Sequence, residues 1–414
     1  MHASRRRFIR NLAGAAACGP IAGTFALTAC ADASRAITSS SSGERAQPAQ
    51  SQLAHATPPS YRRLLVLVEL KGGNDGLNTF VPYRDTAYYA LRPTLAIKAD
   101  AALPLSDRAA FHPALAPLLP YWKRGELAVL QGVGYPQPNL SHFRSIEIWD
   151  TASRSDQYLR DGWLSRAFAS VRPPADFAAD GFVIGSYDLG PLAGGARAIT
   201  IGGAARLASP AIFAEETHAA QTPALAHILR TEADIAHAAA QLSPGAPLAT
   251  TFPASGFGAE VRTACEVVAR SKGVAVVRLT LNGFDTHANQ AGTQARLLGE
   301  LAEGLDALAR GLSEVGRYDD ALILTYAEFG RRPHENASGG TDHGTSSVHF
   351  ALGRRVRGGI HGEAPNLASL TPQSNPPYAI DFRSIYATAL DTWWGVDSRN
   401  VLGGRFASLP IVRT

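Results

Sequence analysis

The sequence predicts an α/β fold in which a mostly parallel sheet lies between two layers of helices. Four short, largely apolar runs have the composition of strands buried on both faces, at residues 63–70, 127–133, 274–281 and 321–326. Segments with helical spacing of apolar residues lie between them, the clearest being a leucine stripe over residues 297–312. Because parallel strands need long crossover connections, this alternation predicts a three-layer α/β/α arrangement.

The first 30 residues are expected to direct export. Ser4-Arg5-Arg6-Arg7-Phe8 precedes an apolar stretch broken by glycines and a proline, a pattern that resembles a signal for the twin-arginine translocase. The stretch ends in Leu27-Thr28-Ala29-Cys30, where either lipidation of Cys30 or simple cleavage at a small-residue site would follow. We therefore expect a periplasmic or otherwise extracytoplasmic protein, tethered to the membrane if Cys30 carries a lipid anchor.

The rest of the chain is expected to form a flexible linker and one domain. Residues 31–60 are rich in Ala, Ser, Gln, Thr and Pro and predict a disordered linker. Residues 61–414 are long enough for a single large domain. Within it, residues 161–258 are rich in Gly, Ala and Pro and are interpreted as an insertion or a cap, with a helix expected at about 223–242.

Charge and cysteine usage exclude some classes of protein. The chain holds 39 basic and 35 acidic residues, a net charge of +4, and four of the arginines lie in residues 1–29, which contain no acid. The remaining basic and acidic residues balance, so no nucleic-acid partner is expected. Only Cys265 lies in the body of the chain, and lipidation of Cys30 would leave it without a partner for an intrachain disulfide.

Carboxylate and imidazole side chains follow three of the predicted strands and fill one glycine-rich loop. The candidate metal ligands are Asp75, Asp285, His287, Glu328, Asp342 and His343. In open α/β sheets ligands bind beyond the carboxyl ends of the strands, so these side chains are expected to converge on one site for divalent ions such as Zn, Mn or Ca. Three of them also have other interpretations. Asp75 could be part of a turn, and Asp285 could cap a helix. Glu328 could lie in a salt-bridged strand exit or act as an acid that supports a ligand.

Ser141 precedes an expected helix over residues 141–149. A serine in this position is the natural N-cap of the helix. It would also lie in the positive end of the helix dipole, where an anionic phosphate or sulfate binds and where a nearby metal activates a hydroxyl. Both interpretations, helix cap and nucleophile, remain open on the sequence alone.

Five ordered motifs carry a resemblance to a known family. They are residues 70–78 (LKGGNDGLN), 139–143 (NLSHF), 283–287 (GFDTH), 328–331 (EFGR) and 340–344 (GTDHG). Together they resemble the bacterial family catalogued as domain of unknown function 1501, which is grouped with the alkaline phosphatase and sulfatase superfamily. The resemblance implies an alkaline-phosphatase-like α/β/α fold with a dinuclear metal site.

Carried over residue by residue, the resemblance implies that Asp75 is an early metal ligand and Ser141 the nucleophile. The two later pairs of ligands would be Asp285 with His287 and Asp342 with His343. The chain departs from the superfamily pattern in the Asp-x-His spacing of the first pair and in the distance between Glu328 and the second pair. The last histidine of the pattern has two candidates, His349 and His361.

These observations predict an exported metal-dependent hydrolase of phosphate or sulfate esters. Its substrate would be a small anionic ester or a sulfated or phosphorylated glycan, with Asn74, Arg144 and Arg331 as candidate substrate-binding residues. The alternative is a non-catalytic exported or lipid-anchored protein of the same fold that serves in envelope or polysaccharide assembly. A serine esterase is disfavoured because no Gly-x-Ser-x-Gly elbow is present, and a nucleotide redox enzyme because Gly-x-Gly-x-x-Gly does not follow the first strand.

Overall fold

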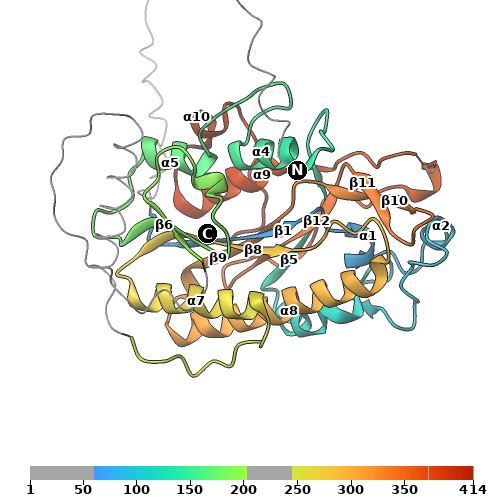
Figure 1. Cartoon of the computed structure of the whole chain (residues 1–414), viewed down its shortest axis with the longest axis horizontal. Helices are drawn as coiled ribbons and strands as arrows, with labels where there is room; N and C mark the ends of the chain where they lie inside the picture. Colours follow the sequence, from blue (N-terminus) through green and yellow to red (C-terminus); the bar gives the residue numbers. More distant parts are fainter. Residues whose placement is uncertain (1–59, 203–244, 372, 414) are drawn as a thin grey trace, which may run out of the picture. The chain divides into compact units, whose positions relative to one another are not determined.

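A nine-stranded sheet forms the middle layer of the computed structural model, which describes residues 60–202, 245–371 and 373–413 (Figure 1). In the order in which neighbours pair, its main path is β13 (Gly359–His361), β5 (Leu127–Gly134), β12 (Ser347–Leu352), β9 (Ala321–Tyr326), β1 (Leu64–Lys71), β8 (Val274–Asn282), β6 (Ala179–Ile184) and β7 (Ala198–Ile201); β14 (Ile380–Asp381) also pairs with β5. Every pair is parallel except the two that β12 makes with β5 and β9. The predicted mostly parallel sheet is therefore confirmed.

Successive residues of β1 belong to two hydrophobic cores, which explains its largely apolar sequence. Leu64 and Val66 pack into the core on one face of the sheet, and Leu65 and Leu67 into the core on the other. The first face is covered by η1 (Pro113–Leu118), α3 (Leu119–Lys123), α7 (Gly256–Arg270) and α8 (Gln290–Glu314). The second face is covered by α4 (His142–Thr151), α5 (Trp163–Ser170), α9 (Phe382–Ala387), the π-helix η6 (Thr388–Trp394) and α10 (Ser398–Leu402). Figure 1 shows this three-layer arrangement, as predicted.

Short elements surround one end of the sheet. A three-stranded sheet pairs β2 (Phe80–Val81), β4 (Ala110–Phe111) and β3 (Leu103–Pro104), and a hairpin pairs β10 (Gly330–Glu335) with β11 (Thr341–Gly344). The remaining helical turns are α1 (Gly76–Thr79), α2 (Thr86–Leu91), η2 (Gly190–Leu192), η4 (Tyr318–Asp320) and η5 (Leu367–Ser369). Among the residues that the structure describes, no helix has the length and apolar character needed to span a membrane.

The glycine-rich segment at 161–258 differs from the expected insertion or cap in the part that is described. It supplies α5, which packs on the sheet, and the parallel strands β6 and β7, which extend the sheet beyond β8. β6 carries Asp180 and Gly181 within its six residues, so its sequence has only a short apolar run at residues 182–184. The expected signal peptide, nearly all of the expected linker and the helix expected at 223–242 lie outside the described residues.

The carboxyl ends of the neighbouring parallel strands β9, β1 and β8 bring three loops together. Gly72 ends β1 with a φ of +115°, and a Cβ atom at this position would lie 2.3 Å from the backbone nitrogen of Asp285 in the loop after β8. Only glycine allows this approach and this backbone conformation without strain. The loop that follows β1 is therefore held directly against the loop that carries Asp285 and His287.

Candidate functional site

Three histidines and one aspartate meet where these strands end. Asp285 and His287 come from the loop after β8, His343 from β11 and His142 from the first turn of α4. One oxygen of Asp285 lies 3.1 Å from Nε2 of His287 and 3.2 Å from Nε2 of His343, and its other oxygen lies 3.3 Å from Nε2 of His142. We call these four residues the histidine cluster.

His142 is held so that one of its ring nitrogens, Nε2, faces the cluster. Its Nδ1 lies 2.8 Å from Oε1 of the buried Glu328, a carboxylate that raises the pKa of His142 mainly by this hydrogen bond. Because the ionised carboxylate only accepts, Nδ1 carries the proton. The opposite nitrogen, Nε2, is buried and makes no hydrogen bond with a described residue, although Oδ2 of Asp285 lies 3.3 Å away.

His343 is oriented in the same way by the backbone. Its Nδ1 lies 2.8 Å from the carbonyl oxygen of Leu140, which only accepts, so Nε2 is unprotonated and points to Asp285. Burial lowers the pKa of His343 and favours this neutral form. Nε2 of His343 also lies 2.9 Å from Nε2 of His287, a spacing that fits a hydrogen bond between the two rings.

Asp342 lies at the edge of the histidine cluster. Its carboxylate is 52 % exposed, accepts a hydrogen bond from Asn336 and lies 3.6 Å from Nδ1 of His287. This position suits a residue that orients His287. It suits less well a residue that binds the same ion as His142 and His343. Gly340 brings this loop close, since a Cβ atom there would lie 2.2 Å from the backbone carbon of His287.

Asp285 is the centre of the cluster and is kept ionised. Burial alone would raise the pKa of its carboxyl group, but chiefly the hydrogen bond and the charge of Arg331 outweigh burial and lower the pKa to about 2. Nη2 of Arg331 lies 2.7 Å from Oδ1 of Asp285. Asp285 is therefore negatively charged at neutral pH, as a metal ligand must be.

The cluster has the donor set and the geometry of a metal site. His142, Asp285 and His343 each offer one ligand atom, and these atoms all lie within 4.8 Å of one another. The buried, unpartnered Nε2 of His142 indicates a missing partner. Histidines that bind metals usually donate their other ring N–H to a carboxylate or a carbonyl, as His142 and His343 do here.

Glu328 supports the cluster without joining it. Its side chain is 2 % exposed, and its two oxygens accept the backbone N–H of Gly72 at 3.0 and 3.2 Å while Oε1 also meets His142. Of the two roles considered from the sequence, ligand or supporting acid, the structure places it in the second.

Replacing Glu328 with glutamine is therefore expected to weaken metal binding roughly 10- to 100-fold, because a neutral amide holds the imidazole of His142 less firmly. Metal titration against a competing chelator measures the change. Glu335→Gln is the matched control, since Glu335 is also a buried acceptor but bonds only Thr94 and Leu95. Equal affinities for Glu328→Gln and the unaltered protein would contradict this role.

Asp75 is not part of the cluster, which corrects the expectation from the sequence. Its carboxylate is fully buried in an ion pair with Arg92, at 2.5 Å, and also accepts from Gln290. One oxygen also caps α1 through the N–H of Leu77. With both oxygens occupied by a buried arginine, Asp75 stabilises the loop after β1 instead of facing an ion.

The three expected substrate-binding residues are also occupied by structural contacts. Arg331 is fully buried and makes five hydrogen bonds to Asp285 and to the carbonyl oxygens of four residues, Gly72, Gly73, Phe284 and Thr341. Asn74 is buried and bonds Thr79, Gln294 and Val348. Arg144 donates to three carbonyls at residues 154–157 and lies over the ring of Tyr158. These residues hold the loops around the site together.

Ser141 occupies the N-cap position of α4, yet its side chain makes no capping hydrogen bond. The residue is exposed, and its neighbours on both sides touch the histidine cluster, Leu140 through its carbonyl and His142 through its ring. The plain capping interpretation therefore does not account for the hydroxyl.

His142 was missed as a candidate although it lies next to Ser141 in the motif Asn139-Leu140-Ser141-His142-Phe143. The two histidines considered instead lie elsewhere. His349 is buried against Trp149 with neither ring nitrogen bonded, and His361 lies near the carbonyl of Arg357. The only sequence signal for His142 is its place at the start of a helix that follows a strand and a loop.

The fold and the cluster define an α/β/α protein with a candidate metal centre at the carboxyl ends of its parallel strands. The chain belongs to the family described as "Protein of unknown function (DUF1501)", which it matches over residues 129–404. No curated protein matches the chain.

Several solved structures are similar to this chain at low identity. The C-terminal periplasmic domain of EcEptC from Escherichia coli, in complex with Zn, is 10 % identical, with 72 % of this chain and 73 % of that chain covered and a TM-score of 0.33. A protein in the alkaline phosphatase superfamily from Vibrio parahaemolyticus is 10 % identical, with coverages of 84 % and 71 % and a TM-score of 0.40. The PsFucS1 sulfatase from Pseudoalteromonas sp. is 10 % identical, with coverages of 86 % and 71 % and a TM-score of 0.39.

Proposed function

We propose that this protein is an exported, metal-dependent hydrolase of phosphate or sulfate esters. The observation that carries the proposal is the meeting of His142, Asp285 and His343. Ser141, which precedes His142 in the chain, is exposed and makes no capping hydrogen bond. The superfamily to which the sequence motifs point supports the same chemistry.

His142, Asp285 and His343 would hold the ion, with His287 at the edge of the same cluster. Two imidazoles and a carboxylate suit Zn or Mn better than Ca, which prefers oxygen ligands. When bound, a divalent ion lowers the pKa of a neighbouring hydroxyl and neutralises charge on an ester oxygen.

The residues around the cluster have distinct positioning roles. Arg331 fixes Asp285, Glu328 fixes His142, and the carbonyl of Leu140 fixes His343. The first turn of α4 presents backbone N–H groups that have no partner within a helix, a position that favours a phosphate or sulfate group. Ser141 lies at this end of the helix. Its oxygen would bond to the phosphorus or sulfur atom as the bond to the ester oxygen breaks, the departing alcohol would take up a proton, and water would then release phosphate or sulfate from Ser141.

Ser141→Ala is expected to lower turnover about 1,000-fold or more while leaving metal content unchanged, since the nucleophile is lost and the ligands remain. The measurement is hydrolysis of a panel of aryl phosphate and aryl sulfate esters by the metal-loaded protein, with Ser155→Ala as the control. Hydrolysis by Ser141→Ala at the rate of the unaltered protein would remove Ser141 from the mechanism.

A second candidate function is supported by the loss of Asp75 and Glu328 from the expected ligand set. Asp75 is paired to Arg92, and Glu328 is bound to Gly72 and His142. One cluster of candidate ligands therefore remains, whereas a dinuclear site needs ligands for two ions. A non-catalytic member of the fold that binds an ion and acts in envelope or polysaccharide assembly would have this arrangement. Stoichiometric metal with no turnover on any ester would favour this second function.

Substrate and location are part of the same proposal. A sulfated or phosphorylated glycan is the expected substrate class, in keeping with the sulfatases among the similar structures. Export by the twin-arginine translocase and an anchor at Cys30 are tested by mass spectrometry of the mature amino terminus. A lipidated Cys30 would establish the tether, and a free amino terminus after Cys30 would establish simple cleavage.

A further inference from the structure

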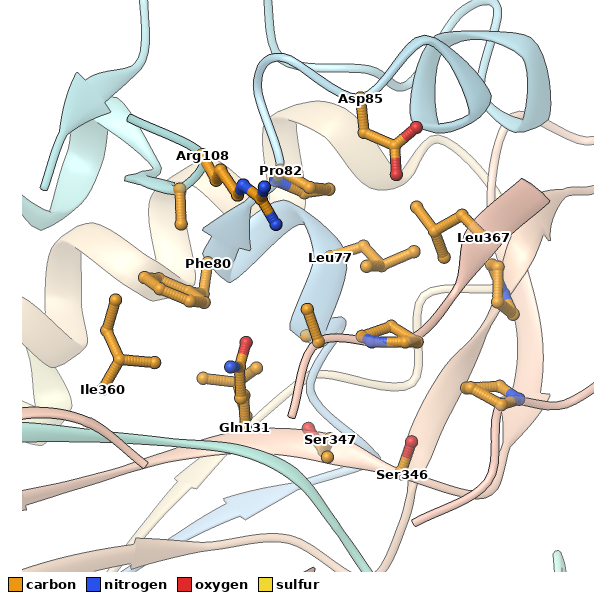
Figure 2. Close-up of a pocket in the computed structure, with 18 of the residues that line it drawn as sticks. Leu77, Phe80, Pro82, Asp85, Arg108, Gln131, Ser346, Ser347, Ile360 and Leu367 are labelled. Atoms are coloured by element: carbon orange, nitrogen blue, oxygen red, sulfur yellow. The ribbon is translucent and has the colours of Figure 1, made fainter. Parts of the chain in front are cut away.

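A cavity of about 820 Å³ lies beside the candidate metal centre but contains none of the histidine cluster (Figure 2). It is bordered by α1, β2, the loop at residues 106–109, the strands β5, β10, β12 and β13, and η5 with residues 364, 365 and 376. Small-molecule sites have volumes of roughly 300–1,000 Å³, so the cavity is large enough for a ligand of ordinary size.

The walls of this cavity are mainly apolar. Leu77, Phe80, Val348, Ile360 and Leu367 line it, and Figure 2 shows Leu77, Phe80, Ile360 and Leu367 around one shared space. Ile360 is 37 % exposed, so part of this apolar lining is open to water. Because apolar walls offer water few hydrogen bonds, a ligand with an apolar body would displace water from the cavity at little cost.

One cation on the rim is free to bind a ligand. Arg108 is exposed, and its guanidinium has no hydrogen bond or ion pair with any described residue. The other two arginines that border the cavity are committed: Arg84 bonds and stacks on Tyr83, and Arg331 bonds carbonyl oxygens and Asp285. Figure 2 shows Arg108 extending beside Pro82 over the Phe80 side of the cavity.

Two acidic residues also border the cavity and limit where an anion can lie. Asp85 caps α2 through the N–H of Ala87 and appears on the Leu77 and Leu367 side in Figure 2, while Asp107 precedes Arg108 on the exposed rim. An anionic group would be repelled by Asp85 and attracted by Arg108. The Phe80 side of the cavity is therefore the favourable end for a negative charge.

We propose that this cavity binds a small molecule with an apolar body and one carboxylate or similar anionic group, which pairs with Arg108. A guanidinium forms strong bidentate hydrogen bonds with such groups, and the apolar walls bind the rest of the molecule. The site is separate from the candidate metal centre and does not depend on the proposed hydrolase activity. Arg331 is shared by the two sites as a fully bonded structural residue.

Calorimetric titration with octanoate and octan-1-ol tests the proposal, because the two probes share an apolar chain and differ in charge. The unaltered protein is expected to bind octanoate about tenfold more tightly than octan-1-ol, the value of one charged hydrogen bond. Arg108→Gln should remove this preference. Arg84→Gln, the matched control on the same rim, should keep it.

Two further variants locate the binding. Leu77→Trp should fill the cavity and abolish binding of both probes. Circular dichroism checks that this variant is folded. If it is not folded, the comparison of Arg108→Gln with Arg84→Gln decides. Asp285→Asn should bind octanoate as the unaltered protein does. The proposal is overturned if neither probe binds the unaltered protein, if Arg108→Gln keeps the preference for octanoate, or if octanoate binding is lost with Asp285→Asn.

Discussion

Asp285→Asn is expected to abolish stoichiometric metal binding. The carboxylate of Asp285 is the one group that touches all three histidines of the cluster, at 3.1 to 3.3 Å. Asparagine keeps the shape and can still accept a hydrogen bond from Arg331, but it removes the negative charge that attracts a divalent ion. Loss of a supporting residue typically costs 10- to 100-fold in metal affinity, so loss of a direct ligand should cost more than about 100-fold.

Elemental analysis of the purified protein, followed by titration with Zn and Mn after chelation, measures this effect. Asp342→Asn is the matched control, because Asp342 is an equally exposed aspartate that reaches the cluster only through His287 at 3.6 Å. It should retain bound metal and lose affinity by less than about tenfold. Full metal content in folded Asp285→Asn would show that the histidine cluster does not bind an ion in the way proposed.

The fold could be predicted from the sequence because burial on both faces leaves a clear pattern. The four strands β1, β5, β8 and β9 have largely apolar sequences, and their predicted bounds lie within one residue of those observed. β6 could not be predicted in the same way, since a strand of six residues with Asp180 and Gly181 lacks that pattern. Its place in the sheet depends on pairing with β8, a contact distant in sequence.

The candidate site could be predicted in part. The sequence predicts polar loops at the carboxyl ends of neighbouring parallel strands. The structure confirms that Asp285, His287 and His343 from these loops lie close together. The role of Asp75 could not be predicted, because its partner Arg92 lies beyond α2 and the ion pair exists only in the folded chain. The role of His142 depends on how α4 enters the site, which the residue types in the motif do not specify.

Arg92→Ala is expected to lower the free energy of unfolding by about 3–5 kcal/mol, because it leaves Asp75 as an unpaired charge in the interior. Both side chains are fully buried, and Arg92 also bonds Asn78 and the carbonyl oxygens of Arg332 and Pro333. Urea unfolding followed by circular dichroism measures the loss.

The double variant Arg92→Met with Asp75→Asn separates the charge from the packing. Because it removes both charges and keeps the approximate volumes, it should recover much of the stability that Arg92→Ala loses. Its metal content, like that of Asp75→Asn alone, should match that of the unaltered protein, since Asp75 faces Arg92 and Gln290 and not the histidine cluster. A folded Asp75→Asn variant without metal would instead return Asp75 to the set of ligands that the sequence motif predicted.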